Sequence, residues 1–266
     1  MTSHLLIIGC GNMGGAMLAG WLAAGLEPAR FSILDPSLES APEGVALYRS
    51  PPDAPGDHDA VLLGFKPQQL SALAPGLQEL CGPGVAVHYL LAGLTLEQLA
   101  AAFPKAEALV RVMPNLAARV NKSPVILAHR GLNAGQRDSV QTLYDTLGTA
   151  VWLEDEAQFD LLTALAGSGP GFVYRFIDAL AQAAQRLGAD RDQAVALATA
   201  MVDGASTLAA NADADPGALA DRVASPGGMT REGLNVLDKD EALIDLLTAT
   251  LGATAKRGAE LSALNG

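Results

Sequence analysis

The chain has 266 residues, of which 50% are hydrophobic and only 17% are charged. This apolar content excludes a disordered chain, and the length fits one large domain or two ordinary ones. The 17 Lys and Arg against 29 Asp and Glu give a formal net charge of −12, which repels phosphate backbones and anionic lipids. Because no basic patch interrupts this charge, neither a nucleic acid nor a membrane is expected as a partner.

Cysteine and histidine predict no structural cross-link. Cys10 and Cys81 are the only two cysteines, and the four histidines are scattered, so neither a disulfide nor a metal site is expected. This cysteine usage favours the cytoplasm. The uncharged run of residues 5–26 is long enough to cross a bilayer, but its many glycines favour a buried strand, a turn and a buried helix.

The first part of the chain alternates between short apolar runs and helix-length segments. Runs of strand length cover residues 4–8, 31–35, 60–65, 85–90, 109–113, 124–128 and 149–153. Residues 14–24 and 95–102 are rich in Ala and Leu and predict helices between these strands, while residues 51–55 predict a proline-rich surface loop. The alternation predicts an α/β domain with a parallel sheet over residues 1–157.

After residue 157 the strand pattern ends. Residues 172–187, 191–209 and 240–264 have helical periodicity, and Pro170, Gly188, Asp190 and the pair Asp215-Pro216 stand where helices start or stop. Residues 158–266 are therefore predicted to form an all-helical domain. Periodicity alone leaves open whether its apolar faces pack within one chain or against a second chain.

Residues 9–14 read G-x-G-x-x-G, directly after the first predicted strand and directly before a predicted helix. In this context the glycines allow a tight turn and a close approach to a pyrophosphate, and the helix N-terminus supplies backbone amides. The pattern indicates a dinucleotide-binding site of the Rossmann type. The alternative is a glycine-rich turn without a ligand.

Asp35 ends the second predicted strand, where an acidic residue accepts hydrogen bonds from the ribose hydroxyls of NAD and repels the 2′-phosphate of NADP. This residue favours NADH as the cofactor. In the alternative interpretation, Asp35 only forms a turn, and Ser37 binds a phosphate.

Two adjacent glycines at residues 227–228 precede a predicted helix at 231–237. The exposed amides of such a loop, together with the Thr230 hydroxyl, can hold a carboxylate beside a hydrogen-bonding group. The same residues can equally be an ordinary helix start, and the pattern alone does not decide between the two.

At this point the sequence resembles the pyrroline-5-carboxylate reductase family over essentially its whole length. The most specific stretch is residues 223–238, read as VASPGGMTREGLNVLD. Other matches, in the family's order, are residues 11–14 (GNMG), 66–68 (KPQ), 92–93 (AG), 111–115 (RVMPN) and 167–170 (GSGP).

The resemblance implies a Rossmann domain followed by a helical dimerisation domain, with assembly of dimers into larger rings in many members. It implies hydride transfer from NAD(P)H to the C=N carbon of 1-pyrroline-5-carboxylate, which gives L-proline. Carried over by motif, the residues implied in cofactor binding are Gly9, Gly11, Asn12, Met13, Gly14, Lys66, Pro67, Ala92, Gly93, Met113 and Pro114. Those implied at the substrate are Asn115, Ser225, Gly227, Gly228, Met229 and Thr230, with Thr230 on the imine nitrogen as the catalytic candidate.

Several residues depart from the family pattern, and they concern the substrate more than the reaction class. Leu116 and Ala117 replace the usual Thr-Pro, Met229 replaces a smaller residue or Thr, and His88 lies in a bulkier strand than usual. A related cyclic imine therefore remains an alternative substrate. A β-hydroxyacid dehydrogenase is disfavoured because no lysine lies between Lys122 and Lys239.

An imine can arrive protonated, so the reaction needs no catalytic histidine, and His88 is expected to be structural. A non-catalytic dinucleotide sensor is the remaining alternative, and the loop at 225–230 argues against it.

Overall fold

A computed structural model of the chain describes residues 4–264. They form two compact units, one reaching to Ser168 and resuming at Ala253, the other spanning Gly169–Gly252. By packing, residues 158–168 and the end of the last helix therefore belong with the first unit. The functional boundary expected after residue 157 stays a prediction.

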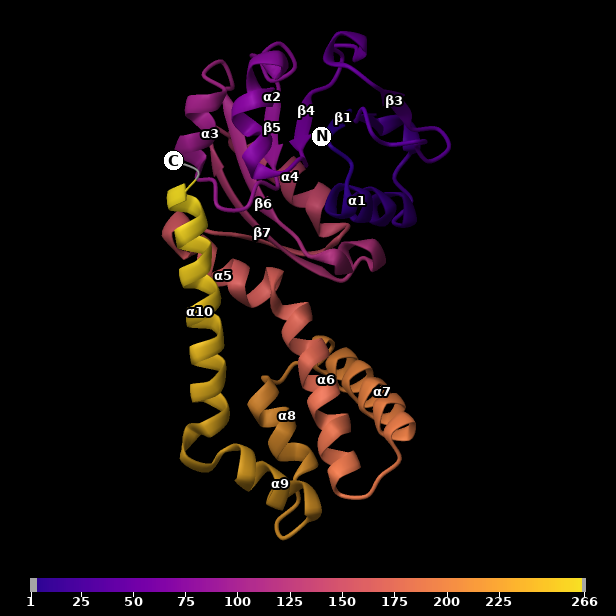
Figure 1. The fold of residues 1–266 in the computed structure, drawn as a ribbon, viewed down its shortest axis with the longest axis vertical. Coiled ribbons are helices and arrows are strands. Elements are labelled where there is room, and N and C mark those ends of the chain that lie inside the picture. Colours follow the sequence, from indigo (N-terminus) through magenta and orange to yellow (C-terminus); the bar gives the residue numbers. More distant parts are fainter. Residues whose placement is uncertain (1–3, 265–266) are drawn as a thin grey trace. The chain divides into compact units, whose positions relative to one another are not determined.

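The first unit contains an eight-stranded sheet with the order β3-β2-β1-β4-β5-β6-β7-β8 (Figure 1). Its strands are β1 (Leu5–Ile8), β2 (Phe31–Leu34), β3 (Ala46–Tyr48), β4 (Ala60–Leu63), β5 (Ala86–Tyr89), β6 (Ala108–Met113), β7 (Ser123–Arg130) and β8 (Gly148–Trp152). All neighbours pair in parallel except β6 and β7. The predicted parallel sheet is confirmed, and β6–β7 is its one antiparallel pair among the described strands. The cause is the connection, which holds only the short 3-10 helix Leu116–Val120 and no crossover helix.

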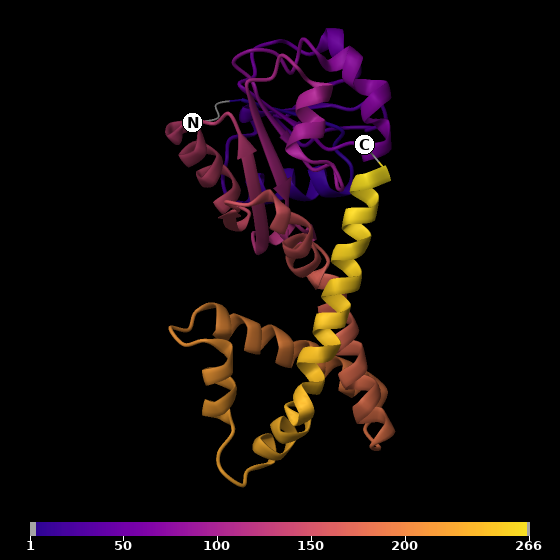
Figure 2. The same cartoon turned by 90° about the vertical axis from the view of Figure 1, so that its left-hand side faces the viewer.

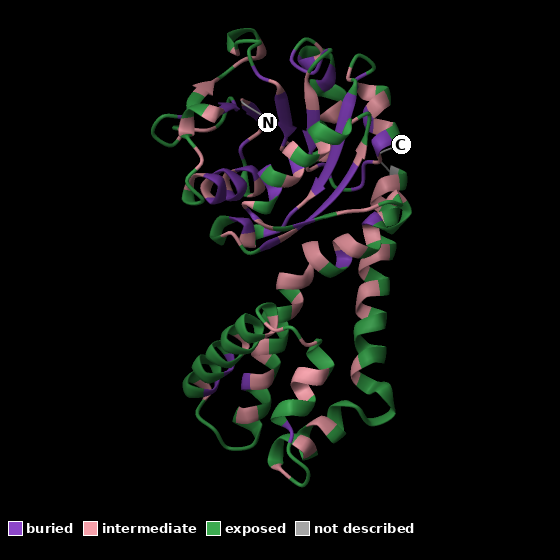
Figure 3. Cartoon of the chain, turned by 180° about the vertical axis from the view of Figure 1, so that it is seen from behind, coloured by how far each residue is buried: buried purple, intermediate pink, exposed green. Residues whose placement is uncertain are grey.

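Helices cover both faces of this sheet, as Figure 1 shows. One face packs against α1 (Asn12–Ala23) and α4 (Ala134–Asp145), where Trp21 stacks on Phe31 with ring centroids 5.3 Å apart. The other face packs against α2 (Leu70–Leu77), α3 (Leu96–Ala102) and α5 (Phe159–Leu162). Because both faces are covered, β1, β2 and β4 are buried along their whole length (Figure 3).

Strand β3 and helices α2 and α4 were not predicted. Strand β3 has only three residues and lies at the partly exposed edge of the sheet, so it carries no continuous apolar run. Helix α2 contains Pro75, which breaks the helical pattern. Helix α4 is polar, but its capping box between Asn133 and Gln136 is a start signal that the sequence does contain.

The second unit is helical, as predicted. It contains α6 (Gly169–Arg186), α7 (Arg191–Ala210), α8 (Pro216–Val223), α9 (Met229–Leu237) and the first half of α10 (Ala242–Leu264). The predicted caps are confirmed, because Asp190 accepts the Gln193 amide at 3.0 Å and Asp215 accepts the Ala218 amide at 2.9 Å. Among the described residues of this unit, only alanines are fully buried, namely Ala181, Ala194, Ala198 and Ala224 (Figure 3).

The last turns of α10 pack beside the loop that follows β5 and beside α3 (Figure 2). Gly93 has φ of +74°, and a Cβ there would lie 3.1 Å from the backbone nitrogen of Ser262. Gln98 of α3 also bonds to the Ser262 carbonyl. None of the helices within residues 4–264 combines the length and the apolar character needed to cross a bilayer.

Candidate functional site

A cavity of about 500 Å³ opens at the carboxyl ends of β1, β2 and β4. Strand order reverses direction between β1 and β4, and such a reversal is where doubly wound sheets bind ligands. The cavity is lined by Ile8, Gly9, Gly11, Leu34, Asp35, Pro36, Ser37, Arg49, Pro51, Gly64, Phe65, Lys66, Gln69, Leu73 and Leu77. We refer to it as the glycine-loop cavity.

The glycines at this cavity allow two backbone segments to touch. Gly9 has φ of +85°, and a Cβ there would lie 2.8 Å from the amide nitrogen of Phe65. A Cβ on Gly64 would clash with the Gly9 carbonyl, so the turn requires glycine at this position too, a requirement that the sequence analysis missed. A Cβ on Gly11 would meet no atom within 4 Å, so this side of the turn is open. Together with the first amides of α1, the turn fits the pyrophosphate of a dinucleotide.

The carboxylate of Asp35 is engaged within the chain. Its Oδ2 accepts the Cys10 amide at 2.9 Å, and its Oδ1 accepts both the amide and the hydroxyl of Ser37, at 2.9 and 2.7 Å. Burial acts to raise the pKa of Asp35, but the bonds from Ser37 and Cys10 outweigh it and hold the pKa below its ordinary value. Asp35 is therefore ionised and fixes the glycine turn. The predicted contact with both ribose hydroxyls is not available in this arrangement.

The other predicted cofactor residues of this region divide into two groups. Lys66 lines the cavity with an exposed side chain, directly after β4 and Phe65. Asn12, Met13 and Gly14 belong to the first turn of α1, and Pro67 begins a 3-10 turn; none of these four lines the cavity. A Cβ on Gly14 would lie 3.1 Å from the Gly9 carbonyl, so Gly14 serves the packing of helix against turn.

A second cavity of about 250 Å³ brings together Ala92, Gly93 and Met113 from the ends of β5 and β6. Its further lining residues are Arg111, Asp160, Thr163, Ala164, Ser168, Thr254, Arg257, Gly258 and Leu261. We refer to it as the Met113 cavity. Residues Thr163–Gly167 form a π-helical turn beside it, a feature that often marks functional sites. The buried hydroxyl of Thr163 has no hydrogen-bond partner among the described residues, and sequence reasoning missed it.

Arg111 forms the buried, charged wall of the Met113 cavity. It is 4% exposed, and its guanidinium donates to Glu156 at 2.9 Å and to Asp160 at 3.2 Å. It also lies 3.8 Å from the ring centroid of Phe159. Glu156 accepts the Leu96 amide at the start of α3 as well, so this cluster joins β6, α3 and α5.

Asn115, a predicted substrate residue, is buried, and its side chain forms hydrogen bonds to other residues of the chain. Its Nδ2 donates to the carbonyl of Ala166 in the π-helical turn, and its Oδ1 accepts the Ala117 amide, both at 2.9 Å. Pro114 is buried beside it, whereas Leu116 is 56% exposed. This geometry favours a positioning role for Asn115, which holds the π-helical turn against the end of β6.

The loop at 225–230 lies in the second unit and forms a tight turn before α9. The Gly228 amide donates to the Ser225 carbonyl at 2.9 Å, and Gly227 has φ of +69°, a conformation that favours glycine. A Cβ on Gly228 would lie 2.5 Å from the Ser225 hydroxyl oxygen. Ser225, Met229 and Thr230 are all exposed, so the turn presents two hydroxyl-bearing residues to solvent.

His88 is structural, as expected. It is fully buried, its Nδ1 lies 2.7 Å from the Tyr144 hydroxyl, and burial lowers its pKa to about 4. It therefore stays neutral at physiological pH.

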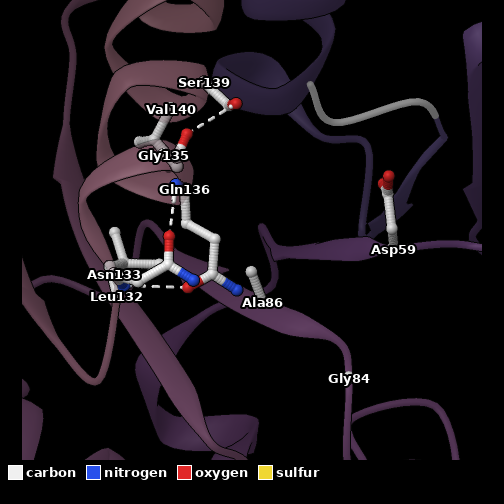
Figure 4. Close-up of a pocket in the computed structure, with 9 residues that line it drawn as sticks. All are labelled: Asp59, Gly84, Ala86, Leu132, Asn133, Gly135, Gln136, Ser139 and Val140. Carbon is white, nitrogen blue, oxygen red and sulfur yellow. Dashed lines mark hydrogen bonds between the residues drawn. The ribbon is translucent and has the colours of Figure 1, made fainter.

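A third cavity, of about 400 Å³, lies at the amino ends of β4 and β5, away from the glycine turn. Figure 4 shows that its polar side chains already bond to neighbours: Asn133 and Gln136 cap each other, and Ser139 donates to the Gly135 carbonyl. Its Asp59 accepts the His4 amide. The third cavity is therefore the weaker candidate.

Two regions of the chain match models of known protein families. Residues 156–261 match the family model described as pyrroline-5-carboxylate reductase dimerisation, and residues 4–85 match the model of NADP oxidoreductase, coenzyme F420-dependent. The chain therefore carries a dimerisation region and an NADP-type oxidoreductase region.

Full-length relatives agree with both matches. The pyrroline-5-carboxylate reductase of Pseudomonas aeruginosa is 30% identical, over 98% of this chain and 97% of its own. Pyrroline-5-carboxylate reductase 2 of Bacillus subtilis is 32% identical, over 96% and 93%. The solved structure of the Coxiella burnetii pyrroline-5-carboxylate reductase superposes with a TM-score of 0.92 at 28% identity, covering 98% of this chain and 99% of that chain. The chain belongs to the pyrroline-5-carboxylate reductase family.

Proposed function

We propose that this protein is an oxidoreductase that reduces the cyclic imine 1-pyrroline-5-carboxylate to L-proline with NAD(P)H. The observation that carries the proposal is the turn at Gly9 and Gly11 at the mouth of the glycine-loop cavity, in a chain whose full-length relatives bear the name of this enzyme. When bound, the dinucleotide supplies the hydride that the C=N carbon accepts.

The residues of the chain bind and orient the cofactor. The open side of Gly11 and the amides of α1 receive the pyrophosphate, and Lys66 adds positive charge at the same cavity. The Met113 cavity, at the ends of the neighbouring strands β5 and β6, is proposed to receive the reacting end of the cofactor. Catalysis of this kind is mostly positioning, because a protonated imine needs only a hydride donor held against its carbon.

The turn at 225–230 is proposed to hold the substrate. Backbone amides at the start of α9 suit the substrate carboxylate, and the hydroxyl of the exposed Thr230 suits the imine nitrogen. Asn115 supports the site from within by fixing the π-helical turn rather than by touching substrate.

We propose a homodimer, with a larger ring of dimers as its further assembly. The dimerisation match over 156–261 supports the dimer. So does the second unit itself, where the side chains of Tyr174, Leu197 and Leu208 are about 70% exposed in the single chain. Action in the cytoplasm stays a prediction from cysteine usage.

The test adds 1-pyrroline-5-carboxylate to the protein with NADPH or NADH. Oxidation of the cofactor is measured as the loss of its absorbance. Six-membered cyclic imino acids and thiazoline carboxylates are run beside it, because Leu116 and Ala117 change the family pattern. We expect the five-membered imine to give the highest kcat/KM. A higher value for another imine would assign the related substrate, and cofactor binding without reduction of any imine would favour the non-catalytic sensor.

A further inference from the structure

Arg49 lines the glycine-loop cavity, although no motif of the sequence distinguishes it. It directly follows the short edge strand β3, which pairs in parallel with β2. This pairing places Arg49 beside the loop that follows β2. In Rossmann folds the adenosine ribose lies at the end of this second strand.

The guanidinium of Arg49 is held in place by backbone carbonyls. Its Nη1 donates to the Asp35 carbonyl at 3.2 Å and also to the Leu38 carbonyl, and its Nη2 donates to the Glu39 carbonyl at 3.1 Å. A guanidinium has five N–H donors, so these bonds leave the Nε donor and one Nη2 donor available within the described chain. Arg49 is thus a fixed cation with two unused donors, next to the predicted ribose position.

The side chains of Asp35 and Ser37 offer no free donor to a phosphate, whereas Arg49 does. Both lone-pair positions of Asp35 Oδ1 are used by Ser37, and Oδ2 accepts from Cys10, so Asp35 has no pair of free oxygens for two ribose hydroxyls. The single hydroxyl proton of Ser37 is already donated to Asp35. The charges of Asp35 and of the exposed Glu39 oppose a phosphate here. Arg49, tethered to the carbonyls of this loop, offsets them, and Lys66 is a second cation that lines the same cavity.

We propose that Arg49 binds the 2′-phosphate of NADPH and makes this chain prefer NADPH over NADH. Arg49 is then the specificity-determining residue of the cofactor site. An arginine in this region is the known means by which Rossmann folds accommodate the 2′-phosphate, and the guanidinium matches phosphate oxygens in a two-pronged geometry. The inference rests on the proposed dinucleotide function and replaces the NADH preference that Asp35 alone predicts.

The test measures dissociation constants by calorimetry for NADPH, NADH, 2′,5′-ADP and 5′-AMP. The proteins are the full-length wild type, Arg49→Gln, Arg49→Lys and the matched control Arg137→Gln, which removes a half-buried arginine of α4 that pairs with Glu154. We expect Arg49→Gln to weaken NADPH and 2′,5′-ADP by about 10- to 100-fold, as for the loss of hydrogen bonds to a charged group. NADH and 5′-AMP should change less than about twofold, Arg49→Lys should lose less than Arg49→Gln, and Arg137→Gln should match the wild type.

Two results would overturn the inference. An equal loss of NADH and NADPH in Arg49→Gln would make Arg49 only a tether of the loop, and unchanged affinity for both would remove it from the site. Failure of the proposed function looks different. A wild type that binds neither dinucleotide overturns both proposals, whereas NADPH selectivity without reduction of any imine overturns the reaction and supports the role of Arg49.

Discussion

Thr230 is the second residue of α9 and follows a turn whose tight geometry depends on Gly227 and Gly228. Within the described chain its hydroxyl is exposed and makes no hydrogen bond, so it is available to a substrate. Thr230→Val keeps the shape and removes the hydroxyl. Leaving a buried partner unpaired costs about 1–3 kcal/mol, so kcat/KM should fall about 5- to 150-fold.

The matched control is Thr142→Val, an exposed threonine of α4 whose hydroxyl bonds only to its own helix. It should behave like the wild type. The dissociation constant for NADPH should stay unchanged in Thr230→Val. Normal kcat/KM in this variant would reduce Thr230 to a helix-start residue, and a loss of NADPH binding would move the 225–230 turn to the cofactor site.

Sequence reasoning at this scale identifies which residues flank the cavities but not which of their atoms are free. The spacing of Gly9, Gly11 and Asp35 predicts that they share one site, and all three line the glycine-loop cavity. The engagement of Asp35 by Ser37, and of Asn115 by Ala166, depends on tertiary hydrogen bonds that no motif encodes. The position of Arg49 depends on β3, a strand too short to predict.

Strand β5 and helix α4 are joined through one buried polar contact, between His88 and Tyr144. Burial lowers the pKa of His88 to about 4 from its ordinary 6.5, while the charge of Asp59 acts in the opposite direction. Between about pH 6.5 and pH 4 the unfolded chain binds a proton at His88 that the folded chain does not bind. The contribution of His88 to stability is therefore present at neutral pH and is lost as the pH falls from about 6.5 towards 4.

From pH 7 to pH 5 this loss amounts to about 2 kcal/mol of unfolding free energy. Urea denaturation at the two pH values checks it, with His88→Gln as the comparison because glutamine does not titrate. The variant should be less stable at pH 7 but lose about 2 kcal/mol less than the wild type on acidification. Equal losses in both proteins would show that His88 is protonated in the folded state or that its pKa is ordinary.

Elements were predictable where burial on both faces gives a continuous apolar run, as in β1 and β4. The antiparallel β6–β7 pair was not, because an apolar run carries no direction and only the short connection decides it. The helices of the second unit follow from their caps at Asp190 and Asp215. In these helices only alanines are buried, so large apolar side chains stay exposed. Helical periodicity alone does not say which surface covers those side chains.

For the whole molecule, the dimerisation match and these exposed apolar side chains predict an obligate homodimer. Large apolar dimer interfaces often leave no stable single chain, so the melting temperature should rise with protein concentration. Analytical ultracentrifugation across nanomolar to micromolar concentrations, with activity measured in parallel, checks this. A fully active monomer at nanomolar concentration would contradict it.

In the proposed reaction a hydride passes from the bound dinucleotide to the imine carbon of 1-pyrroline-5-carboxylate. The most direct measurement uses NADPH carrying deuterium at both positions of the nicotinamide C4, with mass spectrometry and NMR of the product. We expect L-proline with one deuterium per molecule, on the ring carbon that was doubly bonded to nitrogen. Proline without deuterium at that carbon, or no proline while NADPH binds, would contradict it.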